Sequence, residues 1–186
     1  MCNNGRLNFD LKELKSTNNS SFNRALELYN SSFDCNQVEC RFLLIFSCLE
    51  AIFNLDSEEI TKKLGIFCAK LLCEENLKEY KIIHDDIKRL YKKRCDYIHG
   101  SKTNNISIDD EYILRKYTRK IVFIYWLIIL KTKHTAKQIN KFLKSDEKLP
   151  YQIILLVKCL NSDDFDTQQK NYKIMYKIHL YLMIYI

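Results

Sequence analysis

The chain has 186 residues, of which 47% are hydrophobic, and it contains one proline and three glycines. This composition predicts a single compact domain made mainly of helices, with room for a strand or two because isoleucine and tyrosine are frequent. The net charge of +7 would help to attract a polyanion such as RNA, although solubility and a preference for lysine codons explain it equally well.

Eight cysteines are present, but they form no CxxC pair and no Cys/His cluster at zinc-finger spacing. Several stand among apolar residues, where a free cysteine behaves as a small hydrophobe: Cys40, Cys48, Cys68 and Cys159. The N-terminus lacks the apolar core of a signal peptide. We therefore expect a cytoplasmic protein with free thiols, no bound metal and no other cofactor.

The first segment, residues 1–37, is predicted to be a polar arm followed by a short helix at about 22–30. Phe22, Leu26 and Tyr29 would line the buried side of this helix. Residues 38–53 are apolar almost all round, which predicts a central helix.

The polar residues of this central helix fall within one stripe: Glu39, Ser47, Glu50 and Asn54. In one interpretation the stripe faces solvent or pairs with lysines. In the other, Glu50 lies near Arg94 and orients it.

A second long helix is expected over 57–73, because Asp56 and Glu59 have the spacing of a capping box. Its buried face would consist of Ile60, Leu64, Phe67, Ala69, Leu71 and Leu72. A third helix is expected over 75–98. His84 on this helix is interpreted as a surface or capping histidine.

The third helix ends in IKRLYKKRCDYIHGS, residues 87–101. Gly100 is a natural residue to stop a helix, so His99 should lie in the last turn, where the helix C-terminus and Asp96 suit a proton-carrying role. Arg94 precedes His99 by five positions, which is about 140° around an ideal helix. The two side chains can converge only if the arginine reaches around, the last turn is distorted, or a second copy supplies the partner group.

A polar loop, SKTNNIS, follows Gly100 and could flank a cleft. Asp109 and Asp110 then open a helix that runs to about Lys131. Its apolar centre, IVFIYWLIIL, is shorter than the roughly 20 residues of a membrane span, so we expect it to pack in the core. Residues 133–186 are predicted to form a C-terminal extension, with helices at 135–144 and 151–160, that packs on the core or on a second subunit. Whether residues 161–186 are helical is left open.

The run RCDYIHG, preceded by RFLLIFSCLEAIF and SEEITKKLGIFCAKLL, resembles the HEPN superfamily, most closely its Apea-like branch, over residues 38–132. The resemblance implies an all-α, HEPN-like helical bundle that acts as a homodimer. It also implies a metal-independent ribonuclease in which Arg94 and His99 are catalytic. The family commonly has a polar residue directly after the arginine, whereas this chain has Cys95. Either Asp96 supplies the missing polar function or the site is weakened.

RNA is cleaved when its 2′-OH attacks the adjacent phosphorus, which requires proton transfer and stabilisation of the extra phosphoryl charge. A histidine suits the first task and an arginine the second. Supporting roles would fall to Asp96, Cys95 and Glu50. The expected RNA-binding residues are Lys92, Lys93, Tyr97, Ser101 and Lys102, although the lysines also fit an ordinary solvated face.

By resemblance, the function would be cleavage of single-stranded RNA in antiviral defence or as a toxin, controlled by an antitoxin or another defence-system partner protein. The alternative is a non-catalytic dimerisation or binding module that partners a nucleotidyltransferase or another protein, and Cys95 in place of a polar residue keeps this alternative open. The sequence contains no Gly-rich phosphate loop, HExxH motif or nucleophile elbow, so it does not indicate a kinase, a GTPase or a metallohydrolase.

Overall fold

The structure, a computed structural model, describes residues 2–3, 6–7, 20–55, 59–73, 76–100, 106–132 and 136–145. Nearly all of this described part is helical, which confirms the all-α prediction. The helices are α2 (Ser20–Ser31), α3 (Val38–Phe53), α4 (Ile60–Cys73), α5 (Leu77–Ile98), α6 (Ile108–Thr132) and α7 (Ala136–Lys144). The short strands β1 (Cys2–Asn3) and β2 (Arg6–Leu7) pair in antiparallel fashion.

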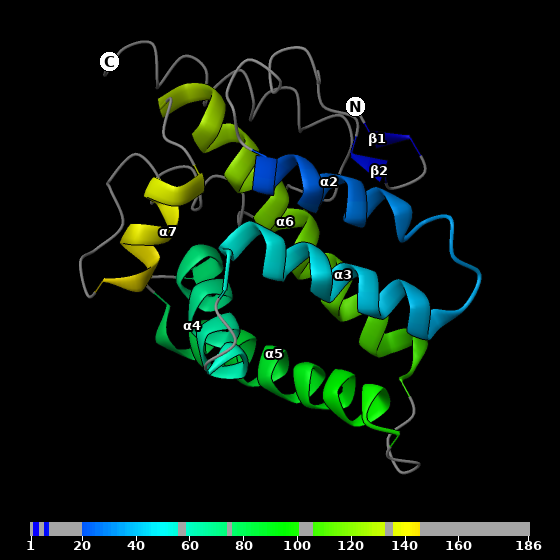
Figure 1. The fold of residues 1–186 in the computed structure, drawn as a ribbon. Coiled ribbons are helices and arrows are strands. Elements are labelled where there is room, and N and C mark those ends of the chain that lie inside the picture. Colours follow the sequence, from blue (N-terminus) through cyan, green and yellow to red (C-terminus); the bar gives the residue numbers. More distant parts are fainter. Residues whose placement is uncertain are drawn as a thin grey trace.

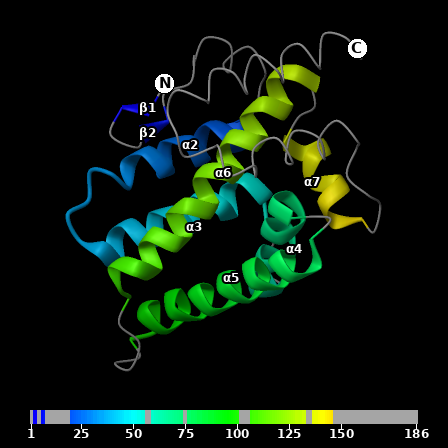
Figure 2. The same ribbon diagram turned by 180° about the vertical axis from the view of Figure 1, so that it is seen from behind.

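Helix α3 is the centre of the bundle, as its apolar sequence predicted. It contacts each of the other described helices. It crosses α6, with α2 along one side and α5 along the other (Figures 1 and 2). Its inward face is fully buried at Phe42, Ile45, Phe46, Leu49, Ile52 and Phe53. Each such side chain contributes about 1.5–3 kcal/mol through burial, so this face supplies much of the core's stability.

Aromatic rings link α3 to three neighbouring helices. The Phe46 ring meets Tyr91 of α5 edge-on with centroids 5.3 Å apart. Phe53 packs in the same way on Phe67 of α4 at 5.5 Å and on Tyr125 of α6 at 5.9 Å. Edge-to-face pairs of this kind favour one relative placement of the helices, because the ring quadrupoles attract in that orientation.

The start of α4 differs from the prediction. Glu59 has a φ of 54°, in the left-handed region, so it stands outside the helix, and α4 begins at Ile60 rather than at residue 57. The predicted cap at Asp56 lies outside the described residues. The predicted inward face is largely correct, since Leu64, Phe67, Ala69, Leu71 and Leu72 are buried.

His84 is less exposed than a surface position would be. A Cβ placed on Gly65 of α4 would lie 2.9 Å from the His84 Cδ2 atom, so the imidazole fills the space beside that glycine. The ring also stacks on Tyr80, with the centroids 6.3 Å apart. His84 therefore helps to pack α5 against α4.

Helix α7 is fastened to the bundle by a buried polar chain. The Tyr125 hydroxyl donates to the Asn140 Oδ1 atom at 2.7 Å, and the Asn140 amide donates to the Ile52 carbonyl at 3.0 Å. Lys70 of α4 donates to the Ser145 carbonyl at 3.0 Å, just beyond the helix end. The predicted helix at 135–144 is thus present, whereas the one predicted at 151–160 lies outside the described residues. Across the described helices, none combines the length and apolarity needed to cross a membrane.

Candidate functional site

Helix α5 begins and ends with clear signals in its sequence. Asn76 caps the first turn, where its side-chain oxygen accepts from the backbone N–H groups of Lys78 and Glu79 at 3.2 and 3.3 Å. At the other end the Gly100 N–H donates to the Tyr97 carbonyl at 3.2 Å, and Gly100 has a φ of 75°. A residue without a Cβ adopts this left-handed conformation most easily, so the expected helix stop is confirmed.

His99 occupies the cap position at the end of α5. Its backbone N–H donates to the Cys95 carbonyl at 2.9 Å, which fixes the backbone of the last turn. The side chain itself is exposed. The imidazole is therefore accessible to a molecule that approaches the end of the helix.

The Arg94 side chain points away from His99 and is held by two residues, Glu50 and Tyr91. Its Nη2 atom lies 3.4 Å from the Glu50 Oε1 atom, and its guanidinium carbon lies 5.2 Å from the centre of the Tyr91 ring. The Tyr91 hydroxyl donates to the same Glu50 oxygen at 3.2 Å. Of the two interpretations of the α3 stripe, the structure supports the one that places Glu50 beside Arg94.

Tyr91 keeps its proton in this arrangement. Burial raises the pKa of Tyr91 to about 12, and the nearby negative charge of Glu50 acts in the same direction. A neutral phenol therefore donates to Glu50 over the physiological pH range. It leaves the remaining lone pairs of the carboxylate for Arg94 and for incoming donors.

The arginine and the histidine do not meet within one chain. Arg94 points toward α3, whereas His99 lies exposed at the end of α5, and no hydrogen bond joins the two among the described residues. This divergence is the one that an ideal helix predicts for positions five apart.

Cys95 packs partly buried against the hydrophobic core. An apolar side chain suits this environment, which gives a physical reason for a cysteine where the resembling family commonly has a polar residue. Asp96 is partly buried, and Tyr97 is 44% exposed. The chain therefore presents Tyr97 rather than Cys95 to solvent beside His99.

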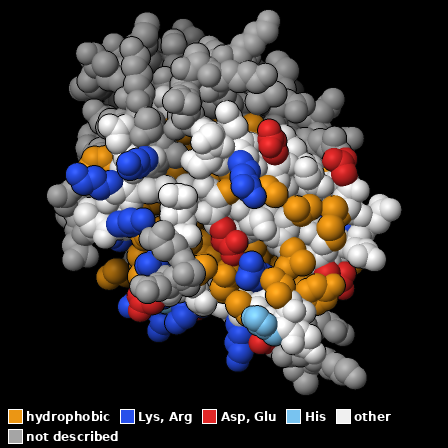
Figure 3. All heavy atoms as spheres, viewed as in Figure 1, with side chains coloured by type: hydrophobic (Ala, Val, Ile, Leu, Met, Phe, Trp, Pro, Cys, Tyr) orange, Lys and Arg blue, Asp and Glu red, His pale blue; other side chains and the backbone are white. Residues whose placement is uncertain are grey.

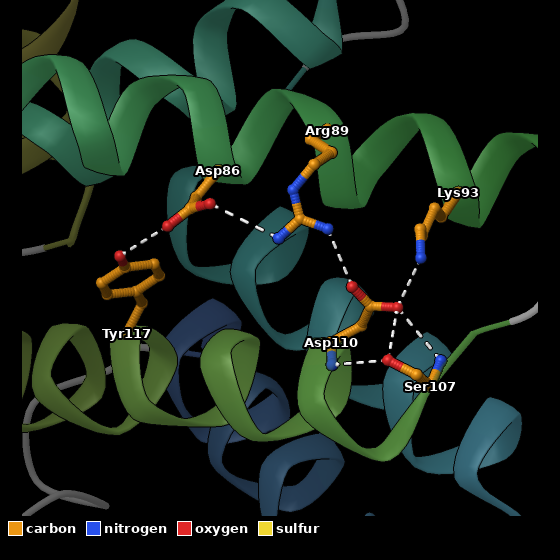
Figure 4. A network of polar contacts seen from close by, with 6 residues as sticks. All are labelled: Asp86, Arg89, Lys93, Ser107, Asp110 and Tyr117. Carbon is orange, nitrogen blue, oxygen red and sulfur yellow. Dashed lines mark hydrogen bonds and ion pairs between the residues drawn. The ribbon is translucent and has the colours of Figure 1, made fainter.

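Lys93 belongs to a different cluster. Its ammonium lies 2.6 Å from the Asp110 Oδ2 atom of α6, and the guanidinium of Arg89 lies 2.8 Å from the other oxygen (Figure 4). Arg89 also reaches Asp86 at 3.4 Å. Lys93 thus links α5 to α6 in the free protein, a structural role that competes with the predicted contact to RNA.

Asp110 also caps its own helix. Its Oδ2 atom accepts from the Ser107 backbone N–H at 3.0 Å, and the Ser107 hydroxyl accepts from the Asp110 N–H at 3.1 Å. This is a capping box at the start of α6. Burial alone would raise the pKa of Asp110, but hydrogen bonds from Lys93, Arg89 and Ser107 outweigh it and hold the pKa well below the ordinary value.

The outer face of α3 is uncovered by other described helices. Leu43, Leu44, Ser47 and Glu50 are only partly buried there, and Tyr97 and Ile98 at the end of α5 are 44% and 49% exposed. Figure 3 shows hydrophobic side chains gathered over this face, with acidic and basic side chains beside them. The Arg94–Glu50 pair therefore lies at the margin of an apolar surface.

The remaining predicted site residues are less informative. Lys92 is exposed on α5, and Ser101 and Lys102 lie outside the described residues. Within the described ranges, no group of three His, Cys, Asp or Glu side chains is placed to hold a metal ion.

From the sequence we did not predict the contacts of Tyr91 with Glu50 and Arg94, nor the Ser107–Asp110 pair of the neighbouring cluster. Tyr91 stands three positions before Arg94, so its place on the same helical face was visible from spacing. The Ser107–Asp110 pair has the Ser-x-x-acid spacing of a capping box directly before an apolar helix.

Comparisons of this chain with protein-family models, with curated proteins and with solved structures find no match. The resemblance to the HEPN superfamily therefore rests on the Arg/His motif and on the helices that precede it. A functional proposal for this chain therefore rests on the residues around Arg94 and His99 and on their geometry.

Proposed function

We propose that this protein is a HEPN-type, metal-independent endoribonuclease that cleaves single-stranded RNA through Arg94 and His99, in a defence or toxin role. The observation that carries the proposal is the arrangement at the end of α5. An arginine held by Glu50 and Tyr91 lies five residues before an exposed histidine at the helix end. A positioned guanidinium with an accessible imidazole supplies the two groups that phosphodiester transesterification needs.

In this mechanism the imidazole of one His99 takes the proton from the 2′-OH as that oxygen attacks phosphorus. The P–O5′ bond breaks, and an imidazolium gives a proton to the departing 5′-oxygen. Arg94 donates parallel hydrogen bonds to the non-bridging oxygens, which carry the developing charge. The products are a 2′,3′-cyclic phosphate and a 5′-hydroxyl.

The proposal includes a homodimer, because one chain directs Arg94 and His99 to different sides of α5. A second copy on the uncovered face of α3 would bring its own histidine toward the first copy's arginine. The partly exposed Leu43 and Leu44, together with Tyr97 and Ile98, provide apolar area for such an interface. Exposed Lys92 would remain available for phosphate contacts at its rim.

The second candidate is a dimerisation or binding module without activity, for example a partner of a nucleotidyltransferase. One specific observation favours it. The Arg94 guanidinium is already paired with Glu50, so a phosphate would have to compete with that carboxylate. In the ribonuclease, Glu50 holds the arginine in place and still leaves donors free, since a guanidinium has five N–H groups.

The test is cleavage of end-labelled single-stranded RNA in EDTA, with analysis of the product ends. We expect the wild-type protein to leave 2′,3′-cyclic phosphates, and Arg94→Ala and His99→Ala each to lose at least about 100-fold in rate. The matched control is Lys88→Ala, which removes one exposed positive charge from the same helix. Inactive wild-type protein that is folded and dimeric would favour the binding module.

Glu50 provides a sharper test of the geometry. Glu50→Gln keeps the shape of the side chain but loses the charge that holds Arg94, so we expect kcat to fall about tenfold while KM changes little. Glu50→Asp should recover part of the loss. Equal activity of wild type and Glu50→Gln would show that the ion pair does not position the arginine.

A further inference from the structure

Two cysteine thiols meet at the junction of α2 and α3. The Cys40 thiol donates to the Cys35 sulfur, and the two Sγ atoms are 2.8 Å apart. The Cys35 thiol in turn faces the Ser31 carbonyl at 3.8 Å. Both side chains are partly accessible, whereas Cys48 and Cys68 are fully buried. Among the described thiols, this pair is therefore both adjacent and open to small reagents.

The backbone around the pair is fixed. Arg41 donates to the Cys35 carbonyl at 3.3 Å and to the Asn36 carbonyl at 2.9 Å, so the connection between the helices is tied to the first turn of α3. The Arg41 Nε atom also lies 3.8 Å from the Glu111 carboxylate of α6. The contact between the thiols is thus supported by the bundle and does not depend on the two side chains alone.

Helix α6 holds the other end of the connection. Arg115 pairs with Glu111 and donates to the Ser32 hydroxyl at 2.9 Å, just after α2. The Arg115 guanidinium also lies 4.1 Å from the centre of the Phe33 ring. Since Ser32 and Phe33 lead directly to Cys35, both flanks of the thiol pair are anchored on α6.

We propose that Cys35 and Cys40 form an oxidation site, which a low-molecular-weight disulfide such as oxidised glutathione converts into an intramolecular disulfide. The sulfur atoms need to approach by less than about 1 Å to reach the bond length of about 2.05 Å.

The chemistry is two successive thiol–disulfide exchanges. The Cys40 thiolate attacks one sulfur of the small disulfide and releases the first small thiol, leaving a mixed disulfide on Cys40. Cys35 then loses its proton to solvent and attacks the Cys40 sulfur, which releases the second small thiol. Two protein thiols are oxidised and one small disulfide is reduced to two thiols. The reverse order, in which Cys35 attacks first and Cys40 resolves the mixed disulfide, gives the same products.

A bond at this place would reinforce the start of the central helix. Gln37, the cap residue of α3, makes no side-chain hydrogen bond to the first turn. A disulfide would close the connection between Cys35 and Cys40 and restrain that turn covalently. This inference is independent of the proposed ribonuclease activity, because Cys35 and Cys40 are not part of the Arg94/His99 site.

The experiment is equilibration of the full chain with defined ratios of oxidised to reduced glutathione, followed by alkylation and peptide mass mapping of all eight cysteines. The same titration in concentrated urea measures the equilibrium constant for the Cys35–Cys40 disulfide in the unfolded chain. We expect the Cys35–Cys40 disulfide to form in the folded protein with an equilibrium constant at least about tenfold larger than in urea, since the fold preorganises the thiols. Equal constants in the two conditions would overturn the proposal.

Single variants provide the controls. Cys35→Ser and Cys40→Ser should each take up one glutathione on the remaining thiol and form no internal bond at this place. Circular dichroism establishes that both variants are folded. A wild-type protein in which Cys35 or Cys40 pairs with another cysteine, or in which both stay reduced while Cys95 is oxidised, would also contradict the proposal.

Discussion

Asp110 offers a direct measurement of what joins α5 to α6. Its side chain is only 6% exposed and forms ion pairs with Arg89 at 2.8 Å and with Lys93 at 2.6 Å. It also accepts hydrogen bonds from the Ser107 backbone N–H at 3.0 Å and from the Ser107 hydroxyl at 2.9 Å. Asp110→Asn keeps the size of the side chain and removes its charge. It also places an amide donor among groups that all donate, so part of the cluster loses its acceptor.

The expected loss at pH 7 is about 2–3 kcal/mol in the free energy of unfolding. Breaking a fully buried pair costs about 3–5 kcal/mol. Here the side chains of Arg89 and Lys93 are 45% and 25% exposed. Water can therefore solvate both cations when the carboxylate is removed, and the loss is smaller than for a fully buried pair. The loss of the capping bond to Ser107 is included in the estimate, at about 1 kcal/mol.

The loss should depend on pH in a definite direction. The cluster depresses the folded-state pKa of Asp110, so its contribution is complete above the unfolded pKa of about 3.9. It is lost as the pH falls below that value toward the folded pKa. Urea unfolding of wild type and Asp110→Asn should therefore differ fully at pH 7 and converge below about pH 4.

Asp109→Asn is the matched control. Asp109 is exposed in the same first turn of α6, so its replacement removes an equal charge from the same helix end without breaking the cluster. It should cost about 0.3–1 kcal/mol through the helix dipole. Equal losses in the two variants, or a loss in Asp110→Asn that does not change with pH, would refute the role assigned to the Asp110 cluster.

Two further predictions concern packing. Asn140→Ala should lower the free energy of unfolding by about 2–3 kcal/mol and increase amide exchange in α7, because the Tyr125 hydroxyl and the Ile52 carbonyl lose their partner. Gly65→Ala should lower it by about 1–3 kcal/mol, because the new methyl would lie 2.9 Å from the His84 ring. Both values are measured by urea unfolding.

These two predictions have simple controls. Lys137→Ala changes an exposed residue of α7 and should shift stability by less than about 0.5 kcal/mol. Gly100→Ala adds a methyl with nothing within 4 Å, so it should cost only the strain of its φ of 75°, about 1 kcal/mol. A Gly65→Ala protein as stable as wild type would mean that His84 moves aside without cost.

The sequence predicted the helices well because their signals are local. The apolar run of α3, Gly100 at the end of α5 and the acidic start of α6 each act within a few positions. The start of α4 was misplaced because Asp56 and Glu59 imitate a capping box, whereas Glu59 adopts a left-handed backbone. Spacing alone does not reveal that conformation.

The partners of charged side chains were harder to predict because they lie far apart in the sequence. Glu50 meets Arg94 and Tyr91 only after α3 and α5 have packed. The sequence placed Glu50 on the polar stripe of α3 but left two directions open for that stripe. The crossing of the two helices decides between them, and that crossing depends on the core packing of Phe46 and its neighbours.

The basic run at the end of α5 shows why charge counts alone overstate the surface that is available to RNA. Arg89 and Lys93 are four positions apart, so they share a helical face, and both point to Asp110 of α6. Arg94 is turned about 100° from Lys93 and points to α3 instead. One face of the run therefore holds the bundle together, and the adjacent face carries the arginine of the candidate site. A substitution at Lys93 should act mainly through stability, whereas one at Arg94 should act mainly through function.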